Sequence, residues 1–326
     1  MNPRLLVLSL GGTITMVPGA GRGIAPKLGA AELIASVPAL AEIAEIEAES
    51  PLRVASPSLT IANLVDVARR IEAAFADGAD GAVVIQGTDT IEESAFILDL
   101  LVGGDRPVVV TGAMRGADAP GADGPANLLA AVRVAATADA RGLGTLVVLN
   151  YAIHAARFVQ KSHTALPSAF LSPLAGPLGA VIEGRPRFFM RVTRNPCLAA
   201  ADGPPRPVAL VKATMGDETH LFRLLAESGC SGFVIEGMGA GHVHADAAPI
   251  LGALAARFPV VLASRVVAGP VFTETYGYPG AEIDLIGRGL IPAGYLSGLK
   301  ARLLLSLALR ETSDRRAIGE HFAAYA

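Results

Sequence analysis

The segment VVIQGTDT, residues 83–90, decides how this chain folds. Its apolar start is typical of a buried parallel strand. The apolar run ends at Gly87, and apolar residues then recur at helical spacing over residues 91–101. The simplest interpretation is that Thr88 or Asp89 caps this helix, since threonine and aspartate are ordinary N-cap residues. The segment therefore predicts a strand, a tight turn and a helix.

A second element of the same kind lies at the start of the chain, where residues 5–15 read LLVLSLGGTIT. Ligands of open α/β sheets bind at the carboxyl ends of the strands, so we expect Thr13 and Thr88 to face one crevice. The paired glycines permit a tight backbone and leave amide groups free to receive an anion. A strand-exit turn without any chemistry is the alternative.

The alternation of apolar strands with helices predicts a mainly parallel sheet flanked by helices. Further strands are expected at 43–54, 107–111, 143–150, 208–212, 232–236 and 260–264, and helices at 30–37, 61–77, 126–138 and 300–309. Residues 15–29 read as a mobile loop, the chain from 151 to 161 as irregular, and the end after Glu311 as peripheral.

The expected domains are a larger N-terminal α/β domain over residues 1–191 and a smaller C-terminal α/β domain over 207–326. Residues 192–206, rich in proline and glycine, form the expected linker. A length of 326 residues, with 52% hydrophobic and 17% charged residues, suits such a globular protein.

Composition also excludes several classes of partner. The net charge is −3 and no basic cluster occurs, so no nucleic-acid or membrane surface is expected. Cys197 and Cys230 fit no metal spacing and indicate a reducing compartment. The pair His242 and His244 is expected at the surface rather than on a metal. The first strand leaves no room for a signal peptide, so we expect a soluble cytoplasmic protein.

Lys161 is notable because the chain has only four lysines and most of its cations are arginine. Lysine, unlike arginine, can lose its proton when it is desolvated and can then act as a base. From composition alone, a solvated surface lysine is the alternative.

Several short motifs follow one another along nearly the whole chain. They are GGTI at 11–14, GTDT at 87–90, GAMR at 112–115, ADGP at 122–125, KSHT at 161–164, SRV at 264–266 and KAR at 300–302. Together they resemble the bacterial-type L-asparaginase/glutaminase family. The resemblance implies amide hydrolysis without a metal or organic cofactor, in a homodimer or a homotetramer of intimate dimers whose subunits share active sites.

The resemblance also implies the roles of individual residues. Thr13 would be the nucleophile that forms an acyl-enzyme, and Thr88 would position the attacking water with Asp89 and Lys161 as its acid–base unit. Substrate-binding positions carried over or suggested in the same way are Gly12, Ser56, Ser58, Gly87, Ala113, Met114, Tyr276 and Glu282.

Three departures from the family pattern bear on the substrate. No tyrosine precedes Tyr151, although the family's lid supplies one to the first threonine. Ser58 stands where the family carries an aspartate that binds the substrate's ammonium group, and Gln86 replaces a common histidine. A neutral hydroxyl at position 58 removes a charge that would hold an ammonium group. Ser56 and Ser58 can also be read as loop residues or caps of the helix that follows.

The C-terminal domain offers substitutes for the missing groups. Its most polar segment, residues 272–282, contains Tyr276 and Tyr278 as candidate phenols, with a packed turn as the alternative. Glu274 and Glu282 are candidates for the carboxylate that a neighbouring subunit directs to the substrate amine in the family.

Three functions remain open from the sequence. The first is hydrolysis of the side-chain amide of L-asparagine, or of glutamine. The second is hydrolysis of another linear or cyclic amide, such as a lactam, an imide or a diketopiperazine. The third is a ligand-binding member without catalysis. The intact core motifs favour the first.

Overall fold

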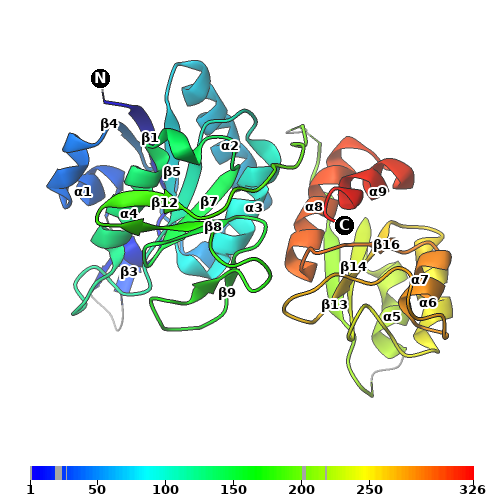
Figure 1. Ribbon diagram of the computed structural model, residues 1–326. Coiled ribbons are helices and arrows are strands. Elements are labelled where there is room, and N and C mark those ends of the chain that lie inside the picture. The colour runs from blue at the N-terminus through cyan, green and yellow to red at the C-terminus, as the bar shows by residue number, and fades with distance from the viewer. Residues whose placement is uncertain (1, 19–23, 27, 200–202, 217–218) are drawn as a thin grey trace. The chain divides into compact units, whose positions relative to one another are not determined.

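The structure is a computed structural model, and it describes residues 2–18, 24–26, 28–199, 203–216 and 219–326. It divides into two compact units, Met1–Cys197 and Leu198–Ala326 (Figure 1). The division lies inside the segment 192–206 that we expected as a linker, and the exact limits of that linker stay a prediction. Each unit is described by itself.

The first unit is built on an eight-stranded sheet in the order β12-β11-β8-β7-β6-β5-β1-β4. Its parallel part consists of β1 (Arg4–Ser9), β4 (Glu45–Glu49), β5 (Gly81–Ile85), β6 (Val108–Thr111) and β7 (Thr145–Leu149). Its antiparallel edge consists of β8 (Ala152–Ala155), β11 (Gly179–Ile182) and β12 (Arg185–Phe188). The expected α/β class with a mainly parallel sheet is confirmed.

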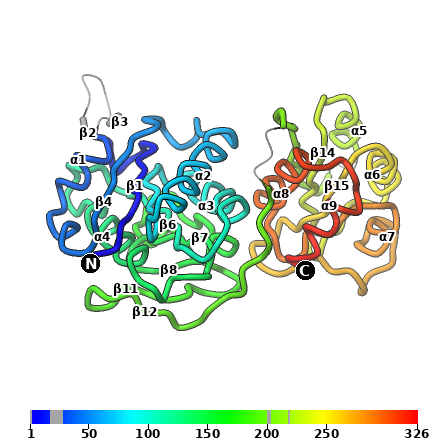
Figure 2. Tube along the Cα trace, turned by 90° about the horizontal axis from the view of Figure 1, so that it is seen from above, coloured from blue at the N-terminus to red at the C-terminus, as the bar shows by residue number. Residues whose placement is uncertain are grey.

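Helices cover both faces of this sheet (Figure 2). One face packs against α1 (Ala30–Ala35) and α4 (Gly124–Ala135), which share a core with alternate residues of β1 and β5. The other face carries α2 (Ile61–Ala76) and α3 (Ile91–Leu101), which pack against each other. The first turn of α2 is fixed by a capping box in which Thr60 and Asn63 bond reciprocally.

The strand order places a switch point between β1 and β5. Starting from β1, the chain first adds β4 on one side and then adds β5, β6 and β7 on the other side. The two loops that leave β1 and β5 therefore turn in opposite directions, which opens a crevice at their carboxyl ends. Thr13 and Thr88 lie in these two loops.

Two glycines bring these loops into direct contact. Gly12 has φ +91°, and a methyl group on it would overlap the backbone nitrogen of Gly87. The amide of Leu10 also donates to the carbonyl of Ile85, at 2.8 Å. Only a glycine permits both this backbone conformation and this approach. The loops that carry Thr13 and Thr88 therefore touch backbone to backbone.

Some predicted irregular segments contain regular structure. The expected mobile loop, residues 15–29, starts at the last residue of a short 3-10 helix, η1 (Thr13–Thr15), and contains the paired strands β2 (Met16–Pro18) and β3 (Ile24–Pro26). Residues 19–23 and 27 of that loop lie outside the described residues. The segment 151–161, expected as irregular, contains β8 and β9 (Gln160–Lys161), and β9 pairs with β10 (Phe170–Leu171). The remaining 3-10 helices of the unit are η2 (Pro38–Glu42), η3 (Ser56–Ser58), η4 (Thr88–Thr90) and η5 (Ala138–Ala140).

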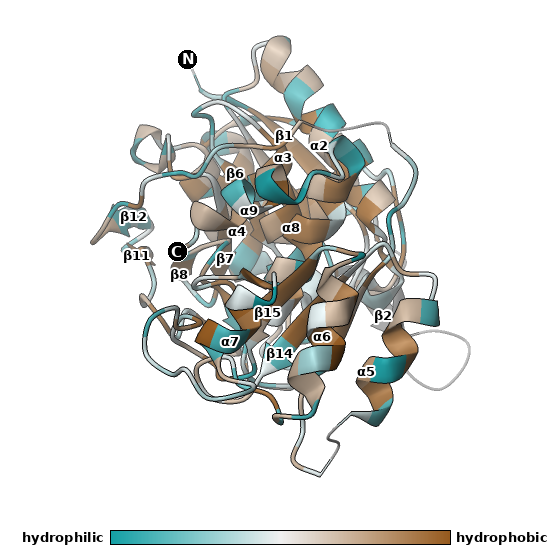
Figure 3. Cartoon of the chain, turned by 90° about the vertical axis from the view of Figure 1, so that its right-hand side faces the viewer, coloured by the Kyte–Doolittle hydropathy of each residue, from teal (hydrophilic) through white to brown (hydrophobic). Residues whose placement is uncertain are grey.

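The second unit contains a parallel sheet in the order β13-β14-β15-β16. Its strands are β13 (Val208–Lys212), β14 (Gly232–Gly237), β15 (Val260–Ser264) and β16 (Ile291–Pro292), and its helices are α5 (His220–Leu224), η6 (Leu225–Glu227), α6 (Ala247–Ala255), α7 (Glu282–Gly287), α8 (Gly298–Glu311) and α9 (Arg315–Ala323). Figure 3 shows the strongly apolar β14 and β15, and helices such as α5 and α6 with both polar and apolar residues. This is the smaller α/β fold that the sequence predicted.

In neither unit does the described part of the chain contain a helix with the length and apolar character of a membrane span.

The end of the chain is part of the second unit's core, so the prediction of a peripheral end after Glu311 was wrong. Helix α9 is capped by Asp314, which accepts hydrogen bonds from the amides of Arg316 and Ala317. Its residues Ile318 and Phe322 are fully buried. The amphipathic spacing of this helix was missed because only two large apolar residues carry it.

Replacing the anchoring ring tests this arrangement. Phe322→Ala is expected to destabilise the second unit by about 3 kcal/mol, since the substitution removes buried apolar surface and leaves a cavity. Urea unfolding followed by circular dichroism measures the change. The exposed Glu320, on the same helix, provides the control: Glu320→Ala should change the free energy of unfolding by less than about 0.5 kcal/mol. Equal stability of both variants would contradict the core position of α9.

A buried histidine makes the first unit sensitive to acid. His154 on β8 is 2% exposed, its Nδ1 lies 2.9 Å from Oγ of Ser172, and its Nε2 has no partner among the described residues. Burial lowers the pKa of His154 from 6.5 to about 4. Between these values the unfolded chain binds a proton that the folded chain does not, so stability is lost as the pH falls through this window.

We expect His154→Gln to remove this part of the acid sensitivity. The buried histidine should cost up to about 3 kcal/mol of stability between pH 6.5 and pH 4. Urea unfolding at both pH values measures the difference for each protein. His163→Gln, which removes an exposed histidine of the same unit, should retain the parent's pH dependence. An unchanged pH dependence in the His154 variant would show that other groups cause it.

The free-energy cost of disturbing the backbone contact at Gly12 can be measured separately from the cost of straining its backbone conformation. Gly104 also has a positive φ, +77°, but a methyl group there would meet no atom within 4 Å. Gly104→Ala should therefore cost about 1 kcal/mol through strain alone. Gly12→Ala should cost about 1–3 kcal/mol more, because the added methyl group forces the two loops apart. Urea unfolding of the pair measures the difference, and equal losses would argue against the contact.

Candidate active site

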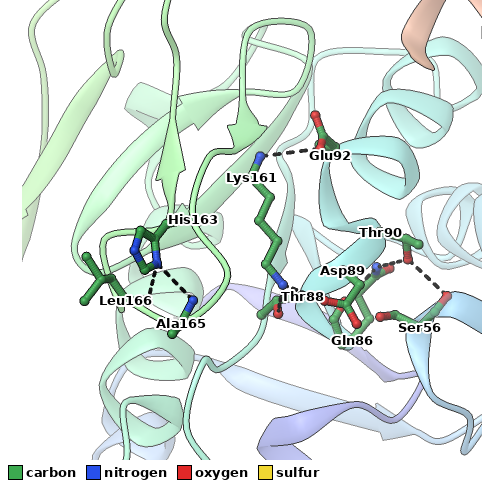
Figure 4. A network of polar contacts seen from close by, with 11 residues as sticks. Ser56, Gln86, Thr88, Asp89, Thr90, Glu92, Lys161, His163, Ala165 and Leu166 are labelled. Atoms are coloured by element: carbon green, nitrogen blue, oxygen red, sulfur yellow. Dashed lines mark hydrogen bonds and ion pairs between the residues drawn. The ribbon is translucent and has the colours of Figure 1, made fainter. Parts of the chain in front are cut away.

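The centre of the candidate site is a contact between Lys161 and the turn after β5 (Figure 4). The Nζ atom of Lys161 lies 2.9 Å from Oγ1 of Thr88 and 2.6 Å from Oδ1 of Asp89. The Lys161 side chain is 15% exposed, whereas that of Asp89 is 60% exposed. One lysine nitrogen therefore joins a buried hydroxyl to a carboxylate that opens to solvent. Such an arrangement can hold and pass a proton.

Neither Thr88 nor Asp89 caps the following helix, so the simplest interpretation of the sequence was wrong. Gly87 precedes the short helix η4, Thr90 precedes α3, and neither helix start has a side-chain cap hydrogen bond. The Thr88 hydroxyl is bonded to Lys161 instead.

Lys161 reaches this position from a strand that lies far away in the sequence. Residues 160–161 form β9, and the amide of Lys161 lies 3.4 Å from Oε1 of Glu92 on α3. The pairing of β9 with β10 continues in the bond from the amide of Ser162 to the carbonyl of Ala169, at 2.7 Å. The hairpin and the first turn of α3 thus fix the lysine backbone, and its side chain extends along the turn at Thr88.

Gln86 and Thr90 connect this turn to the segment that contains Ser56. The Nε2 atom of Gln86 lies 3.2 Å from Oγ1 of Thr90 and 3.3 Å from the carbonyl of Gly87. The Thr90 hydroxyl donates to the carbonyl of Ser56, at 3.2 Å. Gln86 is fully buried, and its Oε1 atom has no partner among the described residues. The sequence did not single out Thr90 for this connection, because its bonding partner lies 34 residues away.

The two serines of the 56–58 segment differ in position. Ser56 is buried, and a methyl group on Gly87 would lie only 2.7 Å from its hydroxyl. Ser58 is exposed. Thr60, not a serine, caps α2, so the capping interpretation of Ser56 and Ser58 was wrong.

The turn after β6 is fixed by a carboxylate. The amides of Met114 and Arg115 donate to Asp123, at 3.0 and 2.9 Å. Ala113 is buried and Met114 is half-buried. Since β6 neighbours β5, this turn lies at the same edge of the sheet as Thr88.

The predicted residues of the second unit form a separate cluster. Glu282 has no exposed surface, and its Oε1 atom accepts hydrogen bonds from the amides of Thr275 and Tyr276, at 3.0 and 2.6 Å. Its Oε2 atom lies 3.0 Å from Nε2 of His242. Burial alone would raise the pKa of Glu282, but these hydrogen bonds outweigh burial and hold it below its usual value.

This position does not suit the expected contact of Glu282 with a substrate amine, because the carboxylate is buried and already bonded. Glu274 is exposed and remains the candidate carboxylate. Tyr276 and Tyr278 are 42% and 50% exposed. His242, expected as a simple surface histidine, is instead bonded to Glu282.

The predicted residues therefore divide between the two units, and Ser58, Ala113 and Met114 belong to the first. Gly12, Ser56, Gly87, Thr88, Asp89 and Lys161 lie together in the first unit, with Thr13 directly after Gly12. Tyr276 and Glu282 belong to the second unit. In the described residues, no group of three or more histidine, cysteine, aspartate or glutamate side chains could hold a metal ion.

Comparison with known proteins gives consistent matches over both units. Residues 4–194 match the model of the asparaginase N-terminal domain, and residues 207–322 match that of the glutaminase/asparaginase C-terminal domain.

Individual relatives match over nearly their whole length. The chain is 36% identical to a probable L-asparaginase of Deinococcus radiodurans, over 98% of this chain and 97% of the relative. It is 34% identical to L-asparaginase 2 of Bacillus subtilis, over 99% and 87%. The crystal structure of a probable cytoplasmic L-asparaginase from Campylobacter jejuni superposes with a TM-score of 0.87 at 34% identity, covering 99% of both chains. This chain belongs to the asparaginase family.

Proposed function

We propose that this chain hydrolyses the side-chain amide of L-asparagine, and that of glutamine as a second substrate, through a threonine acyl-enzyme. Membership of the asparaginase family makes it a hydrolase of amide carbon–nitrogen bonds. The observation that carries the proposed mechanism is the position of Lys161 Nζ between Thr88 Oγ1 and Asp89 Oδ1.

In the proposed first step, the Thr13 hydroxyl attacks the amide carbon and ammonia leaves. Thr13 is half-buried at the carboxyl end of β1, where its position is set by the glycine contact with the β5 loop. A neutral threonine is a weak nucleophile, so a base must accept its proton. Amide groups of Gly12 and of residues 87–89 are the proposed donors to the oxygen of the tetrahedral intermediate.

In the proposed second step, water attacks the acyl group on Thr13. Thr88 orients this water, and the proton that the water loses passes through the Thr88 hydroxyl to the neutral amine of Lys161. Asp89 stabilises the transient ammonium group through the contact at 2.6 Å. When the bond between the acyl carbon and the Thr13 oxygen breaks, this proton returns to the Thr13 oxygen, so the step yields the free carboxylic acid and restores the threonine and the lysine. The partial burial of Lys161 keeps this exchange away from bulk water.

One observation favours a second candidate function. Ser58 is exposed and neutral where the family places an aspartate, so the site lacks that partner for a substrate ammonium group. An amide without a free ammonium group, such as a lactam, an imide or a diketopiperazine, would not need it. Hydrolysis of such an amide is therefore the alternative to hydrolysis of asparagine.

We further propose a cytoplasmic homodimer or homotetramer with active sites shared between subunits, which uses no cofactor. This proposal extends the family resemblance, because the residues suggested for the amine and phenol functions belong to the second unit.

An ammonia-release assay with L-asparagine, D-asparagine and L-glutamine tests the proposed function. Thr13→Ala, Thr88→Val and Lys161→Met should each lower kcat by about a thousandfold, because each removes a group that moves a proton or forms the covalent bond. Lys212, which also pairs with a carboxylate, at 3.4 Å from Glu236, provides the control. Lys212→Met should retain full activity.

Two results would redirect the proposal. If the parent protein releases no ammonia, it would be screened by mass change against cyclic and substituted amides. Hydrolysis of one of these amides would favour the alternative substrates. Full activity of the Thr13 or Lys161 variants would reject the assigned roles, provided that circular dichroism shows them folded.

A further inference from the structure

The second unit contains a chain of hydrogen bonds that runs from a buried carboxylate to an exposed phenol. Glu282 is fully buried, the side chain of His242 is 20% exposed, and Tyr278 is 50% exposed. Oε2 of Glu282 lies 3.0 Å from Nε2 of His242, and Nδ1 of His242 lies 2.9 Å from the hydroxyl of Tyr278. The three side chains therefore form a linear relay from the interior to the surface.

The hydrogen bonds assign the protons within this relay. Glu282 accepts two backbone amide bonds on one oxygen, which suits an ionised carboxylate, and an ionised carboxylate is only an acceptor. Nε2 of His242 must then carry the proton of that bond. In a neutral imidazole Nδ1 is consequently an acceptor, and the Tyr278 hydroxyl donates to it. This is the order of groups in carboxylate–histidine–hydroxyl catalytic triads, with a phenol as the last member.

The loop geometry directs this assignment to Tyr278 rather than to Tyr276. Both rings pack edge-on against His242, with centroids 5.5 and 5.1 Å away. Only Tyr278, among the described residues, has its hydroxyl bonded to a ring nitrogen of this histidine. Tyr276 instead uses its backbone amide to hold Glu282. Of the two candidate phenols that the sequence offered, the bond to His242 favours Tyr278.

We propose that Tyr278 is the acid–base group for the nucleophilic threonine, and that it acts on the site of a neighbouring copy of this chain. This inference rests on the proposed function. It assigns the acceptor of the Thr13 proton, which the proposed function leaves without a residue. The chain has no tyrosine before Tyr151, so the first unit offers no phenol near the first threonine in sequence.

The proposed step conserves protons and charge. As the Thr13 oxygen bonds to the amide carbon, its proton passes to the Tyr278 oxygen, and the phenol's own proton passes to Nδ1 of His242. The imidazolium that forms is stabilised by Glu282, and the negative charge lies on the amide oxygen. When the carbon–nitrogen bond breaks, the phenol gives its proton to the departing ammonia and regains one from His242. The products are acyl-threonine and ammonia, with the relay restored.

Tyr278→Phe tests this role because it removes the hydroxyl and keeps the ring that packs on His242. A purely structural tyrosine would tolerate this change. We expect kcat for ammonia release to fall at least a hundredfold with little change in KM. Tyr276→Phe should lose much less, and Tyr295→Phe, an exposed tyrosine of the same unit, should retain the parent activity. Retention of activity by Tyr278→Phe, or a larger loss in Tyr276→Phe, would overturn the assignment.

Mixed dimers test the second part of the proposal. Thr13→Ala and Tyr278→Phe chains with different affinity tags would be co-expressed, and the mixed assemblies purified through both tags. If the phenol serves the neighbouring copy, each mixed dimer contains one intact site and should recover about half of the parent's activity per dimer. An inactive mixed dimer would reject action on the neighbour.

These tests are separable from those of the proposed function. Loss of activity in Thr13→Ala and Lys161→Met with full activity in Tyr278→Phe would leave the amidohydrolase assignment in place and remove only the relay. A parent protein without ammonia release would be assayed with the amide substrate identified by mass change before the relay is judged.

Discussion

The contact between the backbones of Gly12 and Gly87 is the constraint on which the candidate site depends. It occurs at the switch point of the sheet, where parallel strands β1 and β5 send their loops in opposite directions. A side chain at either glycine would separate these loops or strike the Ser56 hydroxyl. Because the loops touch without intervening side chains, the threonines that follow the two glycines are attached to adjoining stretches of backbone. The fold thus brings the attachment points of two hydroxyl-bearing side chains together before any side-chain interaction is formed.

Side-chain bonds then determine what these hydroxyl groups can do. The Thr88 turn is held from one side by Lys161 and from the other by Thr90, which receives a bond from Gln86 and donates to the Ser56 carbonyl. These bonds replace the helix cap that the sequence suggested. The oxygen of a capping threonine would accept a hydrogen bond from a backbone amide. Here the Thr88 oxygen is bonded instead to a lysine, a group that can exchange a proton. In the proposed mechanism, the uncapped helix start therefore leaves the Thr88 oxygen available for proton exchange. The cost of leaving the helix start uncapped is small beside the stability of a well-packed domain.

The sequence predicted the parallel sheet and the order of its elements well, because continuous apolar runs such as 82–85 are specific for buried strands. It also predicted Thr88, Asp89 and Lys161 as site residues, and the structure brings these three side chains into contact. It failed where the deciding partner is distant. Thr90 has its partner in the 56–58 segment, and His242 has its partners at Glu282 and Tyr278. No local pattern distinguishes a histidine in such a relay from one in a surface pair, and α9 was missed because two apolar residues give a weak helical period.

Each unit bonds a buried or partly buried ionisable group to a group that is more open to solvent. In the first, Lys161 is partly buried and its paired carboxylate is open to solvent, so in the proposed mechanism the group that accepts a proton is the one shielded from water. In the second, the carboxylate of Glu282 is buried and fixed by two backbone amides, and exposure increases through His242 to Tyr278. A fixed buried charge can stabilise a transient imidazolium without moving, which lowers the reorganisation needed during proton transfer. The proposed role of the phenol at the end of this relay would supply the proton acceptor that the chain lacks before Tyr151.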